Sequence, residues 1–279
     1  MARGGFSPWF GLGLAATGAV LAAMMTDEGQ RVARGALMQA REVLRRVSHH
    51  EGTYTSINAN TDGAGVSYGI IQWTQISGNL GRLLQAMRDR DPGAFDTATE
   101  GRGQALLDAT RGEGLRTADG ELLWSSTWRR RLVALGNVPA FREVQEDMAL
   151  QGEHWRGAED AAATLGIRTA RSMALFYDTS VQQGPGKARS IATKLRAWAD
   201  QQSPPLTPAK LLESYAWLCA APFRAEQNPG THPKSPRLQW RQVGAEWHVF
   251  AGKIDLYADI TRRRTGILAD ATLSDDALA

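Results

Sequence analysis

The stretch RRVSHHEGTYTSINANTDGAGVSYGIIQW, residues 45–73, decides the fold of this 279-residue chain. Its first residues continue an apolar pattern at helical spacing that begins near Asp27. The residues on this apolar face are Ala33, Leu37, Ala40, Val43, Leu44 and Val47. The pattern predicts an amphipathic helix from Asp27 to His49, whose C-terminal end carries Glu51.

The second half of the stretch changes to strand and turn residues. Tyr54, Ile57, Val66 and Tyr68 favour strands, and residues 58–65 are rich in Asn, Asp and Gly, which adopt the left-handed conformations of turns. We therefore expect a short β-hairpin, or a small sheet of two or three strands, directly after the helix.

Most of the chain beyond Gly78 has helical patterning. Breaks are expected at residues 91–93, 112–120, 136–139 and 184–186, where glycine and proline interrupt the pattern. Residues 201–208, QQSPPLTP, form the clearest internal linker, and no repeat is visible. The predicted fold class is mainly α (α+β), with one small β element in the first third.

The N-terminal segment is apolar. Residues 4–26 contain no charged residue, and their length is close to the roughly 20 residues that span a bilayer. We predict that residues 1–26 are an export signal or membrane anchor, with residues 7–25 as the possible membrane contact, and the alternative is a buried or surface helix of the folded body. The protein is then secreted, periplasmic or membrane-anchored, facing the cell wall. Residues 27–265 are predicted to form the main folded domain, and residues 266–279 a C-terminal tail.

Composition limits the possible partners. The chain has 43% hydrophobic residues and a net charge of +3, which is too weak to indicate nucleic acid. The single cysteine, Cys219, lies among apolar residues and is predicted to be a buried thiol. We expect a monomer with no nucleic-acid partner.

Two isolated carboxylates in the opening stretch suit glycoside hydrolysis. The reaction needs one protonated carboxyl to donate to the leaving oxygen and one ionised carboxylate to activate water. Glu51 lies at a helix end beside Tyr54, without a lysine or arginine after it until Arg82, which favours the protonated form. Asp62 lies in a glycine-rich turn where the charged form is favoured, and Ser67 could hold a water against it. A plain turn aspartate and a plain helix-end glutamate are the alternative interpretation.

At these residues the sequence resembles a known family. Glu51 and TDGAGVSYGIIQW, residues 61–73, are similar to the catalytic region of the family-46 glycoside hydrolases, the chitosanases, within the lysozyme-like superfamily. The resemblance implies a two-lobed lysozyme-like fold with the hairpin beside the catalytic cleft. It also implies Glu51 as general acid, Asp62 as general base and Ser67 as the residue that holds the attacking water. Residues expected to contact the sugar are Tyr54, Asn60, Gln72 and Trp73.

Two later segments resemble the same family. ALFYDTSVQQGPG, residues 174–186, is similar to a helix whose aspartate, here Asp178, supports a buried arginine network behind the cleft. SPRLQWRQV, residues 235–243, with KIDL, residues 253–256, resembles a late arginine-containing segment. The resemblance makes Arg237 or Arg241 the expected partner of Asp178.

The predicted function is hydrolysis of a β-1,4-linked amino-sugar polysaccharide, by an inverting acid/base mechanism. Gln72 stands where the chitosanases have glycine and resembles the corresponding glutamine of goose-type lysozymes and lytic transglycosylases. Because the chain is basic and peptidoglycan is anionic, we favour peptidoglycan as the substrate, with chitosan as the alternative. The alternative of another class is a non-catalytic protein that binds the cell wall.

Other motifs do not support a different chemistry. HHEGTY has Tyr54 where a zinc-binding helix needs its second histidine, so no metal is expected, and the acid/base mechanism needs no cofactor. GPGK, residues 184–187, lacks the hydroxyl residue of a phosphate-binding loop and is interpreted as a helix break. The basic runs at residues 128–131 and 262–264 are interpreted as solvated faces or a tail.

Overall fold

The computed structural model describes residues 27–59, 63–111, 115–226, 240–243, 246–251 and 254–278. For residues 27–33, 49–51 and the described part of 220–261, only the backbone is described. Asn60, Asp62 and Arg237 lie outside the described residues, as does the apolar segment before Asp27. None of the described helices has the length and hydropathy of a membrane span.

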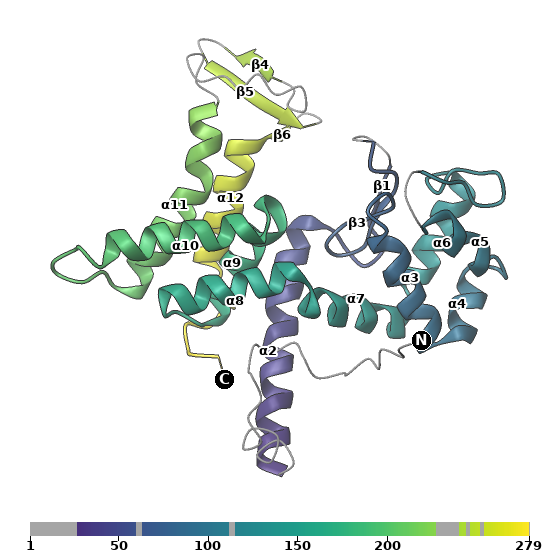
Figure 1. The fold of residues 1–279 in the computed structure, drawn as a ribbon, viewed down its shortest axis with the longest axis horizontal. Helices are drawn as coiled ribbons and strands as arrows, with labels where there is room; N and C mark the ends of the chain where they lie inside the picture. The colour runs from purple at the N-terminus through teal and green to yellow at the C-terminus, as the bar shows by residue number, and fades with distance from the viewer. Residues whose placement is uncertain are drawn as a thin grey trace, which may run out of the picture. The chain divides into compact units, whose positions relative to one another are not determined.

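The described chain is mainly helical and contains two small antiparallel sheets (Figure 1). This confirms the predicted fold class, mainly α (α+β). The helices are α2 (Asp27–Glu51), α3 (Asn79–Arg90), α4 (Pro92–Ala98), α5 (Gly103–Ala109), α6 (Ser126–Gly136), α7 (Pro139–Gln151), α8 (Glu153–Leu165), α9 (Ala170–Gln183), α10 (Pro185–Ala199), α11 (Pro208–Glu226) and α12 (Leu256–Ala269). The strands are β1 (Ile57–Asn58), β2 (Ser67–Tyr68), β3 (Trp73–Thr74), β4 (Trp240–Val243), β5 (Glu246–Ala251) and β6 (Ile254–Asp255).

The chain divides into two compact units. The hairpin unit comprises residues 44–152, and the helical unit comprises the chain up to residue 43 and from residue 153 onward. In the hairpin unit, strands β1, β2 and β3 form one sheet in that order, and α3 packs against α7. The described chain is therefore an α+β fold made of two compact units.

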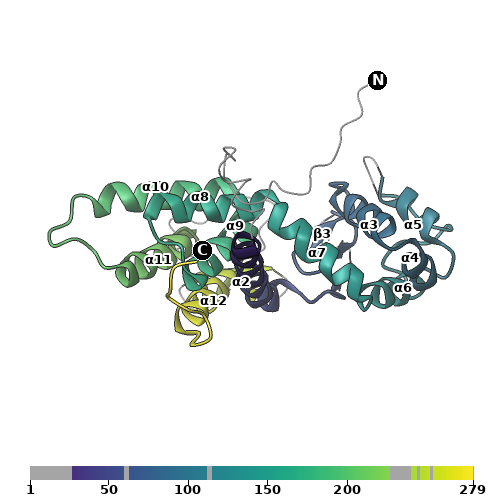
Figure 2. The ribbon, with the colours of Figure 1, turned by 90° about the horizontal axis from the view of Figure 1, so that it is seen from below.

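The helical unit is built around α9. Every residue of this helix from Ser172 to Ser180 is buried, because α8, α10, α11 and α12 all contact it. Figures 1 and 2 both show α8, α9 and α10 packed side by side. The Trp155 ring packs on Tyr177 at 5.4 Å between ring centroids, and the Phe176 ring meets Tyr215 edge-on at 4.7 Å. These aromatic pairs form the centre of the core.

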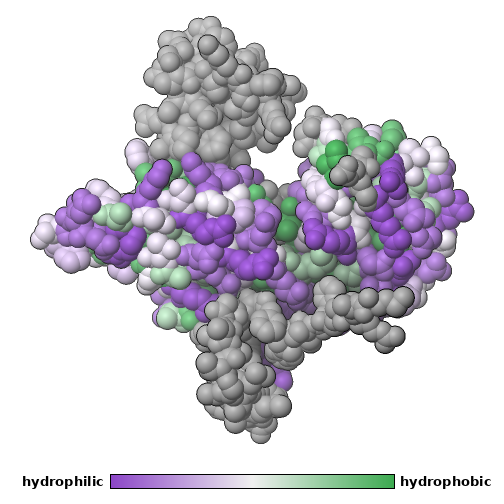
Figure 3. Space-filling view, viewed as in Figure 1, coloured by the Kyte–Doolittle hydropathy of each residue, from purple (hydrophilic) through white to green (hydrophobic). Residues whose placement is uncertain are grey.

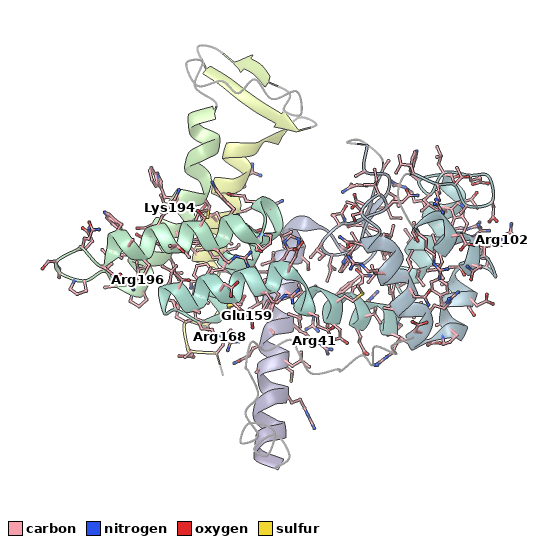
Figure 4. The ribbon with its side chains drawn as sticks, in the orientation of Figure 1. Arg41, Arg102, Glu159, Arg168, Lys194 and Arg196 are labelled. Carbon is pink, nitrogen blue, oxygen red and sulfur yellow. The ribbon has the colours of Figure 1, made fainter. Side chains whose placement is uncertain are left out.

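The outer surface of the helical unit is mainly polar. In the view of Figure 3, hydrophilic and neutral residues dominate over α8 and α10. Glu159 of α8 lies beside Arg168, at 3.6 Å between charged atoms, and both are labelled in Figure 4. Burial raises the pKa of the Glu159 carboxyl, and the charge of Arg168 opposes part of that rise.

The helix breaks lie where glycine and proline predicted them. Gly184 caps α9 with a φ of 89°, which favours glycine, and Pro185 begins α10 at a position where its missing N–H costs nothing. The GPGK motif is therefore a helix break, as predicted. Residues 200–207 connect α10 to α11, in the place of the predicted linker.

The second sheet, β4 to β6, is a feature that the sequence interpretation missed. We expected helices throughout this region, but β4 pairs with β5 in antiparallel register, Trp240 opposite Val249. The segment Glu246–Ala251 alternates polar residues with aromatic and β-branched ones, which is the pattern of a strand.

The interpretation of residues 262–264 as a solvated face or tail holds for Arg262, which is exposed, but was wrong for Arg263 and Arg264. These residues belong to α12, where the Arg264 side chain is 1% exposed and the Arg263 side chain 15%. In the other basic run, Arg130 is exposed and Arg131 is largely covered, and the two pair with Glu100 at 2.8 and 3.1 Å. A run of arginines can thus be a surface feature or part of a core, depending on which carboxylates face it.

The C-terminal segment packs against the start of α9. Leu273 is buried, the N–H of Leu278 donates to the Arg168 carbonyl at 2.8 Å, and Arg171 pairs with Asp275 at 2.8 Å. The predicted boundary between residues 265 and 266 falls within α12. The predicted division into an N-terminal segment, a catalytic domain and a tail stays a prediction.

Candidate active site

Helix α2 ends at Glu51, and the next residue, Gly52, lies close to the hairpin. Glu51 is the last residue of the helix, and the N–H of Gly52 closes it by donating to the Ser48 carbonyl at 2.7 Å. A side chain at position 52 would lie 2.9 Å from Gln72 Nε2 and 3.1 Å from the Gly69 carbonyl oxygen. A larger residue at position 52 would therefore require Gln72 or the chain at Ser56 and Gly69 to shift. The Glu51 side chain lies outside the described atoms.

A tight polar turn leads from Glu51 to β1. The N–H of Thr53 donates to Ser56 Oγ at 2.7 Å, and the N–H of Ser56 donates to the Thr53 carbonyl at 3.0 Å. The N–H of Gly69 then donates to the Ser56 carbonyl at 2.9 Å. The helix end and the sheet are joined through these backbone bonds.

The sheet has one apolar and one polar face. Residues paired directly across an antiparallel sheet share a face, so the register defines two rows. The apolar row is Ile57, Tyr68 and Trp73, and the polar row is Asn58, Ser67 and Thr74. Tyr68 is fully buried and its hydroxyl donates to the Leu132 carbonyl at 2.9 Å, so the apolar row faces the core.

This register separates two of the residues predicted for the site. Ser67, half-buried, lies at the centre of the polar row, where its hydroxyl can meet a bound water. Trp73 lies in the apolar row and is only 7% exposed, so the structure does not bring it together with Ser67. The expected sugar contact at Trp73 is instead a core position.

Gln72 lies at the edge of the polar row. Its backbone has a φ of 56°, and its side-chain amide donates to the Gly69 carbonyl at 2.8 Å and accepts from Asn58 Nδ2 at 2.5 Å. A Cβ added at Gly52 would lie 2.9 Å from Gln72 Nε2, so Gln72 lies close to the residue after Glu51. Its role as a sugar contact stays a prediction.

The turn that carries Asn60 and Asp62 is outside the described residues, but its exit is well defined. Gly63 and Gly65 have φ values of 81° and 76°, as expected for the glycines of this turn. Gln75, buried, accepts from the Val66 N–H at 3.3 Å and donates to the Ala109 carbonyl at 2.9 Å. The arm leaving the turn is thereby attached to α5.

Tyr54 is anchored rather than free. Its hydroxyl donates to the Glu146 carboxylate at 2.5 Å, and Glu146 also accepts from Arg45 Nε at 3.0 Å. The Arg142 guanidinium lies 5.5 Å from the centre of the Tyr54 ring. Burial raises the pKa of the Tyr54 hydroxyl, and the bond to Glu146 raises it further. The predicted sugar contact of Tyr54 is therefore limited to its half-buried ring.

Three side chains that organise this region were not identified from sequence: Gln75, Gln145 and Glu146. Each is buried and each connects segments far apart in the chain. In the sequence they look like ordinary polar residues of a surface. Only their lack of exposure in the folded chain distinguishes them.

Asp178 belongs to the helical unit and is fully buried in α9. Its carboxylate forms an ion pair with Arg264 of α12, and Arg263 Nη1 lies 3.6 Å from its other oxygen. The sequence interpretation did not name these two arginines as partners of Asp178. The expected partners Arg237 and Arg241 lie outside the described side chains, so their role stays a prediction.

The described residues contain no group of three or more His, Cys, Asp or Glu side chains that could hold a metal ion. Cys219 is fully buried beside Thr179, with 3.4 Å between Sγ and Oγ1. Burial raises the pKa of the Cys219 thiol to about 12, so it is a core residue and not a nucleophile.

The comparisons with known proteins identify the fold. No family model and no curated protein sequence matches the chain. Among solved structures, it is similar to the GH46 chitosanase of Gynuella sunshinyii in complex with chitotetraose, with a TM-score of 0.52 and 19% identity over 82% of this chain and 86% of that one. It is also similar to the native chitosanase of Bacillus subtilis MY002, with a TM-score of 0.46 and 17% identity over 70% of this chain and 80% of that one.

The first of these similarities shows that this chain has the fold of a family-46 chitosanase, a lysozyme-like α+β fold.

Proposed function

We propose that this protein is a glycoside hydrolase that cleaves β-1,4-linked glucosamine polymers of the chitosan type. The observation that carries the proposal is the arrangement after α2. A glutamate ends the helix, and a sheet with Ser67 at the centre of its polar row follows within the same compact unit. The solved structure that shares this fold is a chitosanase in complex with chitotetraose.

In this proposal Glu51 donates a proton to the leaving oxygen. The C-terminal end of a helix carries partial negative charge, which disfavours a second negative charge there. Glu51, as the last residue of α2, is therefore in a position that favours the protonated acid. The described turn after it is closed by hydroxyl and backbone bonds and places no basic side chain between residues 52 and 59.

Asp62 acts as the general base, and Ser67 holds the attacking water. The inverting reaction requires the two carboxyl groups to lie about 6.5 to 9.5 Å apart, so that the water fits between Asp62 and the sugar. Inversion of a β-linkage gives an α-anomer as the first product. No cofactor is needed, because proton transfer alone completes the reaction.

Chitosan takes precedence over peptidoglycan as the proposed substrate. The sequence favoured peptidoglycan through the net charge of +3 and through Gln72. In the structure, the amide of Gln72 already bonds Gly69 and Asn58, so Gln72 is occupied within the protein. The shared fold with a chitosanase then supports the chitosan alternative.

The site of action is a separate proposal. We infer that the protein works outside the cytoplasm, delivered or anchored by the uncharged residues 4–26. Cell fractionation, with the mature N-terminus determined by mass spectrometry, tests this. Recovery of the intact chain in the cytoplasmic fraction would contradict it.

The decisive experiment is reducing-end release by the full-length chain from chitosan and from purified peptidoglycan in parallel. We expect release from chitosan, lost in Glu51→Gln and in Asp62→Asn. Glu143→Gln is the matched control, because Glu143 is an exposed glutamate of α7 that pairs only with Arg90 in the described contacts.

The possible outcomes separate the candidate functions. Release from peptidoglycan alone would replace the substrate but keep the mechanism. Binding to either polymer without release, unchanged in Glu51→Gln, would favour the non-catalytic wall-binding protein.

A further inference from the structure

The side chain of Gln145 connects the two segments on which the proposed reaction depends. This residue of α7 is 0% exposed. Its Nε2 donates to the Tyr54 carbonyl at 3.1 Å, and its Oε1 accepts from the Ile70 N–H at 3.2 Å. Tyr54 lies three residues after Glu51, and Ile70 lies three residues after Ser67. One amide group thus spans the acid segment and the hairpin.

Both ends of this connection require an amide. An ionised glutamate would lose the donor to Tyr54, and a methionine would lose the donor and the acceptor while filling a similar volume. The backbone at Gly69 also rests on Gln145 Oε1, since a Cβ at Gly69 would overlap that oxygen and the φ of 81° favours glycine. The packing of α7 against the hairpin therefore depends on the amide group of Gln145 and on the absence of a side chain at Gly69.

Glu146, the next residue of α7, binds the side chain of Tyr54 in the loop after α2. Glu146 accepts from Tyr54 Oη at 2.5 Å and from Arg45 Nε at 3.0 Å. Arg45 is on α2, six residues before Glu51, so Glu146 contacts the chain on both sides of Glu51. Neighbouring side chains of α7 thus fix the carbonyl and the hydroxyl of Tyr54 at the same time.

We propose that Gln145 is a positioning residue that sets the separation between Glu51 and the hairpin arm carrying Asp62 and Ser67. This proposal rests on the proposed function. Buried hydrogen bonds hold their partners in one geometry because breaking them leaves polar groups unpaired. A misplacement of about 1 Å in a catalytic constellation can reduce the rate on the order of 100-fold.

The test compares Gln145→Met with Gln151→Met, an exposed glutamine at the end of the same helix. We expect kcat on chitosan to fall on the order of 100-fold in Gln145→Met. KM should change less than about threefold, because substrate contacts remain. Gln151→Met should match the wild type. Rates are measured below the melting temperature of each variant, so that loss of folded protein does not enter kcat.

A second variant, Gln145→Glu, gives a readout that destabilisation alone would not produce. A buried carboxyl tends to remain protonated, and its O–H can then replace the missing donor to the Tyr54 carbonyl. We expect its kcat relative to the wild type to be highest at acidic pH and to fall as the carboxyl ionises. This variant decides the question if Gln145→Met fails to fold.

Each outcome bears on one proposal or on both. A folded Gln145→Met with kcat within twofold of an active wild type would overturn the positioning role and leave the proposed function intact. A Gln145→Glu whose relative kcat does not change with pH would do the same. A wild type that releases no sugar from chitosan or peptidoglycan would overturn both, because there would be no reaction to position.

Discussion

The Tyr54 hydroxyl and the Glu146 carboxylate are 2.5 Å apart in the folded chain and 92 residues apart in the sequence. The bond links the loop after α2 to α7, and Arg45 binds the same carboxylate oxygen. The loop that leaves the proposed general acid is therefore held by a helix far along the chain.

Removing that bond should destabilise the protein. In Tyr54→Phe the ring stays, but Glu146 loses one of its donors, and a hydrogen bond to a charged group contributes roughly 1.5 to 3 kcal/mol. Because Tyr54 is only half-buried, we expect a loss of about 1.5 kcal/mol in the free energy of unfolding, measured by urea denaturation. A loss below about 0.3 kcal/mol would show that the remaining partners of Glu146, Arg45 among them, suffice.

Ser67 should be replaceable by threonine but not by alanine. Threonine keeps the hydroxyl at the centre of the polar row, and its branched side chain suits a strand. We expect Ser67→Ala to lower kcat on chitosan about 10- to 100-fold, while Ser67→Thr keeps most of the activity. Equal activity in the two variants would remove Ser67 from the water site.

The inverting mechanism predicts that the first product is the α-anomer. NMR of the sugar released in the same samples measures the anomer that forms first.

Gly136 should not tolerate a side chain. A Cβ there would overlap the Tyr54 carbonyl oxygen and lie 2.5 Å from the Tyr68 hydroxyl. We expect Gly136→Ala to lower the free energy of unfolding by about 1 to 3 kcal/mol. The control is Gly93→Ala in helix α4, where the nearest atom is 3.8 Å away and alanine is the better helix former. Calorimetry of the two variants should therefore show opposite or clearly unequal changes in Tm.

Asp178 should be essential to stability. Asp178→Asn removes the carboxylate that faces Arg263 and Arg264 and leaves two guanidinium groups in the core without its charge. Breaking a buried ion pair in this way typically costs about 3 to 5 kcal/mol. A denaturation midpoint close to that of the wild type would mean that other groups balance the arginines.

The buried thiol predicts a loss of stability at alkaline pH. The Cys219 pKa is raised by burial from 9.0 to about 12, so the folded state holds this proton more tightly than the unfolded state. The protonated Cys219 thiol contributes its full stabilisation below pH 9.0. This part of the free energy of unfolding is lost as the pH rises to about 12, by up to about 1.4 kcal/mol per pH unit.

The measurement is the free energy of unfolding between pH 8 and 11 for the wild type and Cys219→Ala. The wild type should lose stability more steeply with pH. Parallel curves would contradict a buried thiol, as would rapid reaction of the native protein with a thiol reagent at pH 8.

Much of the local structure follows from the sequence. The α2 helix was predictable from its apolar spacing, the glycine-rich turn from residues 58–65, and the break at residues 184–186 from glycine and proline. These features depend on neighbours in the chain, and local conformational preferences are read from short segments. The order of motifs was sufficient to indicate the fold that the structural comparison then showed.

The sequence by itself thus determined the helix that ends at Glu51, the hairpin after it and the class of fold. The tertiary structure decided which face Trp73 occupies, because only the register with Tyr68 defines the core side of the sheet. It also decided that Arg264 is buried and that Gln75 and Gln145 hold the hairpin. Buried polar side chains such as these stabilise the fold because segments far along the chain supply their hydrogen-bond partners. The local sequence pattern does not show which distant segments will lie beside them.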